Sequence, residues 1–118
     1  MTLVETEFNK KIGGYTPLKW NSPASGVFVS DESMTSFIFS LTEGDKFELT
    51  DKAHAAFHHS NYGPVFGRGY DLCIHDKANT NNSSRANINC TYKNSKYQCD
   101  KQSWLRFGGG ESCHFKVK

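Results

Sequence analysis

The sequence predicts a mainly β fold, a two-sheet antiparallel β-sandwich with one or two short helices. Apolar and polar residues alternate in short runs, most clearly over residues 36–41 and 46–49, and this alternation is typical of strands with one buried face. Glycine, proline and asparagine separate the runs and mark turns. With 118 residues, we expect a single domain over residues 1–118, because a second hydrophobic core would not fit.

Two hairpins are predicted in the first half of the chain. Residues 2–8 and 12–15 form strands on either side of a turn at Asn9, because asparagine favours turn conformations. Residues 36–41 and 46–49 form the second hairpin around a Glu-Gly-Asp turn. One face of its first strand carries Phe37, Phe39 and Leu41.

A loop is predicted between these hairpins. Pro17 and Pro23 prevent regular strand pairing there. Trp20 is expected to anchor the loop in the core, because a large indole is rarely left in water. A short apolar strand follows at residues 26–29.

The spacing of apolar residues changes after residues 50–51, which can cap a short helix over residues 53–58. His54 and His58 would then lie one turn apart and, with His59, could hold a metal ion. The pattern supplies no further ligand, and no glutamate stands between the histidines as in H-E-x-x-H. We therefore expect polar histidines on the outside of a helix, and no metal site.

Residues 61–76 are the stretch on which the rest of the sheet depends. Glycines and a proline predict a chain reversal at a crowded sheet corner, which Phe66 fills. The glycines are Gly63, Gly67 and Gly69. In the strand that follows, Tyr70, Leu72 and Ile74 are predicted to face one way, and Asp71, Cys73 and His75 the other. A phosphate-binding loop is excluded, because these glycines precede a strand and not a helix.

The C-terminal part is expected to contain a loop and two strands. Residues 76–84 are loop-forming and lack the ligand pattern of a calcium loop. Residues 87–92 alternate as a strand does, and residues 113–118 begin a last strand. Because the chain stops inside this pattern, we expect a fragment of a longer protein.

Composition excludes several classes of function. A formal charge of +2, with both signs interspersed, argues against binding to nucleic acid or insertion into a membrane. No signal peptide is visible, so a cytoplasmic location is expected. The four cysteines form no C-x-x-C pair, which argues against a zinc ribbon or a thioredoxin-like site and predicts free thiols. No cofactor is implied.

The ordered motifs together resemble the TLDc domain. They are Gly-Gly-Tyr-Thr at residues 13–16 with Trp20, Ser-Phe-Ile-Phe-Ser-Leu at 36–41, Asn-Tyr-Gly-Pro-Val-Phe-Gly at 61–67 and Asp-Leu-Cys-Ile-His-Asp at 71–76. The chain is most similar to divergent members with an Asn/Ser-rich loop. The structural motif residues are Gly13, Gly14, Trp20, Phe37, Phe39, Gly63, Phe66, Gly67 and Gly69.

The resemblance implies a β-sandwich with short helices at its edge and no established enzymatic chemistry. It implies protection against oxidative stress and binding to the vacuolar-type proton ATPase (V-ATPase). Family domains also carry elements before the Gly-Gly-Tyr motif and a longer last strand, so an incomplete domain is expected here. Its uncovered sheet face could then form a dimer.

Three functional hypotheses follow. The first is a non-catalytic interaction module, since no Ser-His-Asp or Cys-His arrangement stands out. The second is a redox or enzymatic domain, in which Cys73 or Cys90 works with a nearby histidine. The candidate histidines are His75, on the same strand face as Cys73, and His114. The third is sacrificial thiol oxidation at Cys99, which stands in a polar stretch.

Overall fold

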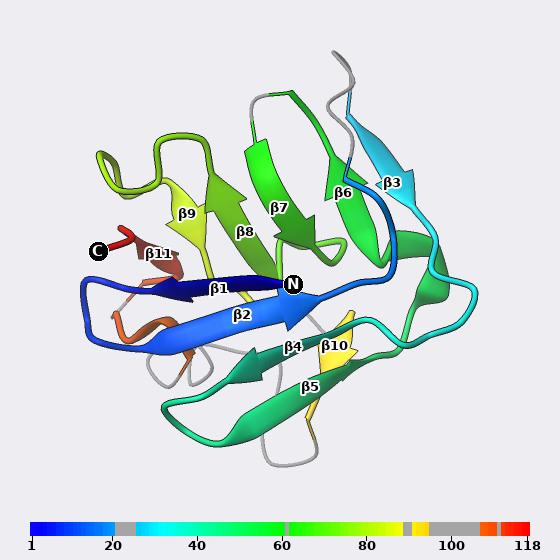
Figure 1. Cartoon of the computed structure of the whole chain (residues 1–118), viewed down its shortest axis with the longest axis horizontal. Coiled ribbons are helices and arrows are strands. Elements are labelled where there is room, and N and C mark those ends of the chain that lie inside the picture. Colours follow the sequence, from blue (N-terminus) through cyan, green and yellow to red (C-terminus); the bar gives the residue numbers. More distant parts are fainter. Residues whose placement is uncertain (21–25, 61, 89–90, 95–106, 111) are drawn as a thin grey trace.

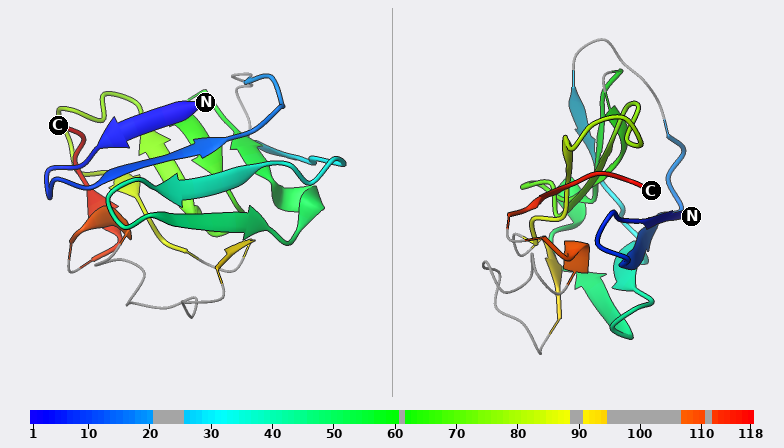
Figure 2. Two further views of the ribbon diagram at one scale, coloured as in Figure 1. Left: turned by 60° about the horizontal axis from the view of Figure 1, so that its bottom comes forward. Right: turned by 90° about the vertical axis from the view of Figure 1, so that its left-hand side faces the viewer.

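The structure is a sandwich of two antiparallel sheets, seen in a computed structural model that describes residues 1–20, 26–60, 62–88, 91–94, 107–110 and 112–118. Within these residues the first sheet contains, in spatial order, β1 (Thr2–Glu5), β2 (Lys11–Tyr15), β4 (Phe37–Ser40), β5 (Asp45–Leu49) and β10 (Tyr92–Lys93). The second contains β11 (His114–Phe115), β9 (Ser84–Arg85), β8 (Leu72–His75), β7 (Tyr62–Phe66), β6 (Ala56–His58) and β3 (Val27–Val29). The strands of the two sheets cross one another (Figure 1), and the sheets form separate layers (Figure 2). The predicted fold class is confirmed.

Both predicted hairpins are present in the first sheet. β1 pairs with β2, and the turn between them contains Asn9 with a φ of 64°. β4 pairs with β5 around Gly44, which has a φ of 71°. Asparagine and glycine tolerate this left-handed conformation better than other residues, so local sequence alone sets both turns.

The Gly13-Gly14 pair in β2 lets aromatic rings approach the sheet from both sides. A Cβ on Gly14 would lie 2.6 Å from Cζ of Phe66, which comes from the opposite sheet. A Cβ on Gly13 would clash with the Thr2 carbonyl oxygen of the neighbouring strand and would lie 2.8 Å from Cζ of Phe39, whose ring lies on the outer face. Because successive residues of a strand point to opposite faces, two adjacent glycines are needed for the two contacts.

The core lies between the sheets and is filled by aliphatic and aromatic side chains. Among the described residues, the largest buried ones are Ile12, Ile38, Phe47, Phe66, Leu72, Tyr92, Phe107 and Phe115. In β4 the inward residues are Ile38 and Ser40, so Phe37 and Phe39 lie on the outer face. Trp20 differs from its predicted place in the core. It is 38% exposed and packs at the rim, with its ring centroid 5.4 Å from that of Phe66.

The predicted helix over residues 53–58 is wrong in its length and in its second half. A single 3-10 turn, η1 (Lys52–His54), begins after Asp51, whose side chain accepts a hydrogen bond from the Ala53 amide. The chain then enters β6, which pairs with β3 and β7. Pairing with these two strands on either side outweighs the helix propensity of the alanines, which is a weak local preference.

The stretch 61–76 contains a strand where the sequence predicted only a corner. β7 passes through Gly63 and Pro64, and a register shift between Tyr62 and Val65 accommodates them in the pairing with β8. A Cβ on Gly63 would lie 2.8 Å from the Ile74 carbonyl oxygen of that neighbouring strand. Close backbone approach therefore accounts for a glycine there.

The reversal itself covers residues 67–71, between β7 and β8. Gly67 has a φ of 92° and Tyr70 a φ of 59°. The Gly69 carbonyl accepts a hydrogen bond from the side-chain amide of Asn87 at 3.3 Å. The alternation of strand β8 begins only at Leu72. The prediction that Tyr70 shares the inward face of Leu72 and Ile74 is therefore wrong. Tyr70 lies with Cys73 on the outer side of the sheet.

The C-terminal segment packs against the end of β1. Thr6 forms an isolated β-bridge with Val117, and the Lys118 amide donates to the Glu5 carbonyl at 2.8 Å. Of the predicted strand over residues 87–92, Tyr92 lies in β10, residues 87 and 88 are irregular, and residues 89–90 lie outside the described residues. The last predicted strand is confirmed at β11.

Candidate functional site

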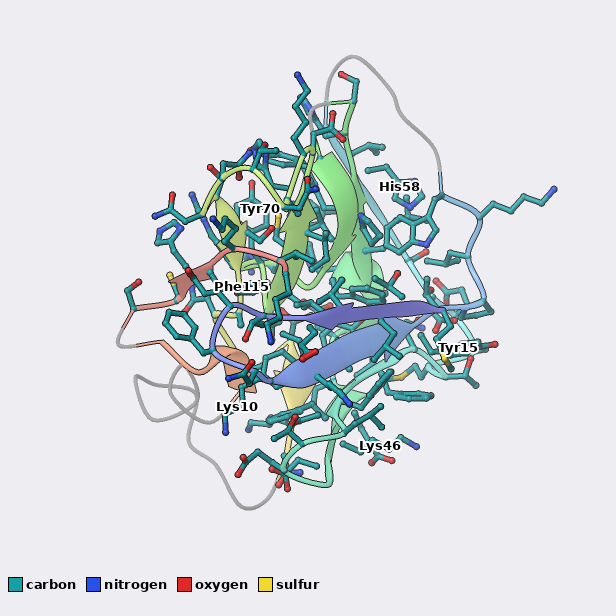
Figure 3. All side chains as sticks on the ribbon, turned by 60° about the vertical axis from the view of Figure 1, so that its left-hand side comes forward. Lys10, Tyr15, Lys46, His58, Tyr70 and Phe115 are labelled. Atoms are coloured by element: carbon teal, nitrogen blue, oxygen red, sulfur yellow. The ribbon has the colours of Figure 1, made fainter. Side chains whose placement is uncertain are left out.

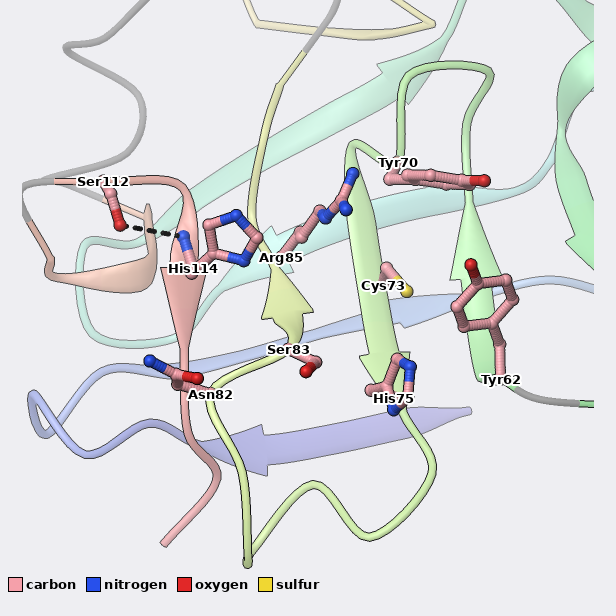
Figure 4. Close-up of a pocket in the computed structure, with 9 residues that line it drawn as sticks. All are labelled: Tyr62, Tyr70, Cys73, His75, Asn82, Ser83, Arg85, Ser112 and His114. Carbon is pink, nitrogen blue, oxygen red and sulfur yellow. Dashed lines mark hydrogen bonds between the residues drawn. The ribbon is translucent and has the colours of Figure 1, made fainter.

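A pocket of about 420 Å³ lies on the outer face of the second sheet. Its floor is a cross-strand row in which Cys73 of β8 pairs with Arg85 of β9, and Arg85 pairs with His114 of β11. His75, Ser83 and Ser112 each stand two residues from a member of this row and line the same pocket. Residues two apart on a strand share a face, so the antiparallel register gathers these side chains (Figure 4).

Arg85 and two tyrosines form one wall of the pocket. The Arg85 guanidinium carbon lies 5.3 Å from the ring centroid of Tyr70, in a cation–π contact. Tyr62 lies beside both Tyr70 and His75, with ring centroids 6.0 Å and 5.2 Å away. The phenol of Tyr70 is protonated at neutral pH, and burial, and next the neighbouring Tyr62, raise its pKa further above the ordinary value.

The structure brings Cys73, His75 and His114 to this one pocket, as the enzymatic hypothesis requires. The thiol of Cys73 is nevertheless poorly suited to nucleophilic chemistry. Burial raises its pKa to about 12, and the opposing effect of Arg85 is smaller. The thiolate is the reactive form, and activated cysteines have a pKa well below the usual value. Cys73 is therefore a buried structural thiol.

We expect Cys73 to resist modification in the folded protein. An aromatic disulfide reagent at pH 7.5 should label the native Cys73→Ala variant as fast as the wild type, because Cys73 is 2% exposed and protonated. In denaturant the variant should release one thiol fewer. Cys113→Ala is the matched control, since Cys113 is free and partly exposed, and it should remove a thiol that reacts in the native state. Loss of a fast-reacting native thiol in Cys73→Ala would contradict the assignment.

The three histidines of the metal hypothesis do not converge. His54 Nδ1 lies 2.7 Å from Asp51 Oδ2, and the His59 ring stacks on Phe57 on the outer face. His58 points the opposite way, is 4% exposed and lies 5.1 Å from Trp20 between ring centroids. Burial lowers the pKa of His58, so it is neutral in the folded protein at neutral pH. Among the described residues, no group of three or more His, Cys, Asp or Glu side chains could hold a metal ion.

The outer face of the first sheet carries a second feature, here called the aromatic face. It consists of Leu3, Tyr15, Phe37, Phe39 and Leu41. Tyr15 stacks on Phe37 with centroids 5.5 Å apart, and Lys46 Nζ lies 4.5 Å from the Phe37 ring centroid. Figure 3 shows Tyr15 and Lys46 with the first sheet, away from His58 and Tyr70 of the second. Leu3 and Leu41 are 56% and 58% exposed, so apolar area is available to a partner.

Sequence reasoning identified Cys73, His75 and His114 but missed the role of Arg85. Arg85 follows an Asn/Ser-rich loop, and only its pairing with both β8 and β11 places it in the pocket. Tyr62 was assigned to a corner and not to a strand, so its position beside His75 was missed as well. The remaining cysteine candidates, Cys90 and Cys99, lie outside the described residues.

Comparison with known proteins identifies the chain at the family level. Among the described residues, no helix has the length and apolar character needed to cross a membrane. No curated protein matches the chain, and no solved structure matches it. A family model described as the TLDc domain matches residues 1–117, a span that includes both sheets.

Proposed function

The chain belongs to the TLDc domain family, and on this basis we propose that it is a non-catalytic protein-interaction module that acts in the cytoplasm. Its proposed partner is the V-ATPase, and its proposed physiological role is resistance to oxidative stress. The TLDc family is generally regarded as non-enzymatic. The raised pKa of Cys73 supports the same conclusion, because it makes one of the two thiols named in the enzymatic hypothesis a poor nucleophile.

The observation that carries the proposal is the aromatic face. Aromatic side chains and exposed leucines lie together there, and the cores of protein interfaces are rich in such residues. Tyr15 and Phe37 are held by stacking, so they lose little side-chain entropy when a partner binds. Lys46 and Glu48 provide charged groups beside the apolar area, as at the rim of an interface.

The proposal is tested by binding to the purified peripheral sector of the V-ATPase. Leu41→Glu should weaken binding by about tenfold or more, because it buries an unpaired charge in the interface. Leu41 is 58% exposed, so the variant should keep its stability. Val27→Glu is the matched control, since Val27 is 47% exposed and lies on the second sheet. Equal binding by wild type and Leu41→Glu would contradict the use of this face.

Self-association through the aromatic face is the competing outcome. If the face pairs with a second copy, light scattering should show a wild-type dimer that Leu41→Glu converts to a monomer. A stable wild-type monomer that unfolds cooperatively would exclude the dimer. Failure of the wild type, and of a version extended at both ends, to bind the peripheral sector would end the V-ATPase proposal.

A further inference from the structure

The pocket on the second sheet has the chemistry of an anion site. We propose that it binds a small organic anion, with a phosphate or carboxylate group held at Arg85 and the remainder of the molecule against Tyr62 and Tyr70. This site is on the opposite sheet from the aromatic face and does not depend on the proposed partner.

The charge of the pocket favours an anion. Arg85 lies at the centre of the cross-strand row and contributes a permanent positive charge. Among the described residues that line the pocket there is no aspartate or glutamate. Within the described part of the chain, no carboxylate forms an ion pair with Arg85. Its contact with Tyr70 orients the guanidinium without neutralising it.

Hydrogen-bond donors surround this charge. His114 offers ring nitrogens, and Ser83 and Ser112 offer hydroxyl groups. Nδ1 of His75 lies 3.1 Å from the Asp76 carbonyl oxygen and donates its proton there. The phenol of Tyr70 is protonated at neutral pH, as any tyrosine of ordinary pKa is, and burial and Tyr62 raise its pKa further. Phosphate and carboxylate oxygens accept such hydrogen bonds, and the planar arginine fork can bind two oxygens of one group.

The shape of the pocket indicates an organic ligand. Its volume of about 420 Å³ lies within the range of small-molecule sites and exceeds the need of one inorganic oxyanion. Tyr62 and Tyr70 lie 6.0 Å apart between ring centroids and present aromatic surface beside Arg85. A flat or apolar group attached to the anion can pack there and gain affinity that free phosphate lacks.

The test is an NMR titration of the folded chain with phenyl phosphate, inorganic phosphate and benzoate at constant ionic strength. Phenyl phosphate or benzoate should give saturable amide shifts at Arg85 and His114, and should bind more tightly than inorganic phosphate. Arg85→Gln should weaken this binding by about tenfold or more, and Arg85→Lys by less, because lysine keeps the charge but not the fork. Arg68→Gln is the matched control, since it removes an exposed arginine outside the pocket and should leave binding within about twofold.

The outcomes separate the parts of the proposal. Saturation by phenyl phosphate alone, or by benzoate alone, supports the site and identifies the anionic group. Equal affinity for phenyl phosphate and inorganic phosphate would overturn the role of the tyrosines. No saturation by any probe, or equal binding by wild type and Arg85→Gln, would overturn the site. If the spectrum shows that Arg85→Gln is unfolded, Arg85→Lys provides the same comparison.

Discussion

Gly14→Ala should lower the free energy of unfolding by about 3 kcal/mol, the upper part of the range for overpacking a core. The added methyl group would lie 2.6 to 2.9 Å from three carbons of the Phe66 ring. Phe66 is 1% exposed and packs against Tyr92, with centroids 6.2 Å apart, so the ring has little room to move. Urea unfolding followed by tryptophan fluorescence and far-UV circular dichroism measures the change.

A second variant tests whether the cause is the contact with Phe66. Phe66→Leu should itself be destabilising, but Gly14→Ala combined with Phe66→Leu should cost less than the sum of the two, by about 1 kcal/mol or more. Gly108→Ala is the matched control, because its nearest neighbour would be the Ala86 Cβ at 3.2 Å, a milder approach. If the effects of Gly14→Ala and Phe66→Leu on stability are additive, the destabilisation by Gly14→Ala does not come from its contact with Phe66.

The parts of the fold that the sequence predicted are those set by local pairing. The two hairpins of the first sheet depend on alternation and on turn residues such as Asn9 and Gly44, which act within a few positions of one another. The strand at Leu72 was found for the same reason, since the register of a half-buried strand follows its apolar pattern.

The parts that were missed depend on contacts distant in sequence. The residue pattern around Ala56 and His58 predicted a helix. This segment forms the strand β6 instead, because β3 and β7 pair with it on both sides. Pro64 has no amide hydrogen for strand pairing and so argued against a strand at β7. The register of β7 and β8 shifts between Tyr62 and Val65, so the pairing does not require a hydrogen bond from Pro64. Neither effect can be inferred from a local window of residues.

In the candidate site, too, the sequence predicted the local features and missed the contacts between residues distant in sequence. Cys73 and His75 were predicted to share a strand face, because two-residue spacing is a local property. Arg85 and His114 join them only through the order of β8, β9 and β11 in the sheet. The environment of Cys73 argues against a reactive thiol at this position, and the local sequence did not show it, because burial is a property of the packed fold.

Asp31 organises the turn that leads into β4. Its carboxylate accepts hydrogen bonds from the backbone amides of Ser33, Thr35 and Ser36 at 2.9 to 3.1 Å. The hydroxyl groups of Ser33 and Ser36 lie 2.5 and 2.7 Å from the same carboxylate. Met34, in the middle of this turn, has a φ of 53°, a conformation that costs energy for a non-glycine residue. The hydrogen bonds to the Asp31 carboxylate therefore stabilise a turn in which Met34 adopts an unfavourable backbone conformation.

Asp31→Ala should lower the free energy of unfolding at pH 7 by about 3 kcal/mol, because hydrogen bonds to a charged group are lost and the buried amide and hydroxyl of Ser36 lose their partner. Asp31 is 2% exposed, so water cannot readily replace the carboxylate. Asp31→Asn should cost less, since the amide keeps one acceptor oxygen. Glu32→Gln is the control. Its salt bridge with Lys52 is exposed, and its loss should change stability by less than about 1 kcal/mol.

The pH dependence of this difference identifies the charge as the cause. Burial raises the pKa of Asp31, but hydrogen bonds from Ser33 and Ser36 outweigh burial and lower the net pKa below 3.8. A carboxyl group with a lowered folded pKa stabilises the protein above its unfolded pKa and loses that contribution as the pH falls through the folded value. The stability difference between wild type and Asp31→Asn should thus be constant from pH 7 to about pH 5 and shrink below about pH 4.

His58 provides an internal check on this measurement. Burial lowers its pKa from 6.5, so the unfolded chain binds its proton first and stability falls as the pH drops below about 6.5. This loss occurs equally in wild type and in Asp31→Asn, and it cancels in their difference. A difference that already changes between pH 7 and pH 5 would mean that Asp31→Asn has disturbed His58. A difference that persists unchanged to pH 3 would show that the turn depends on the shape of Asp31 and not on its charge.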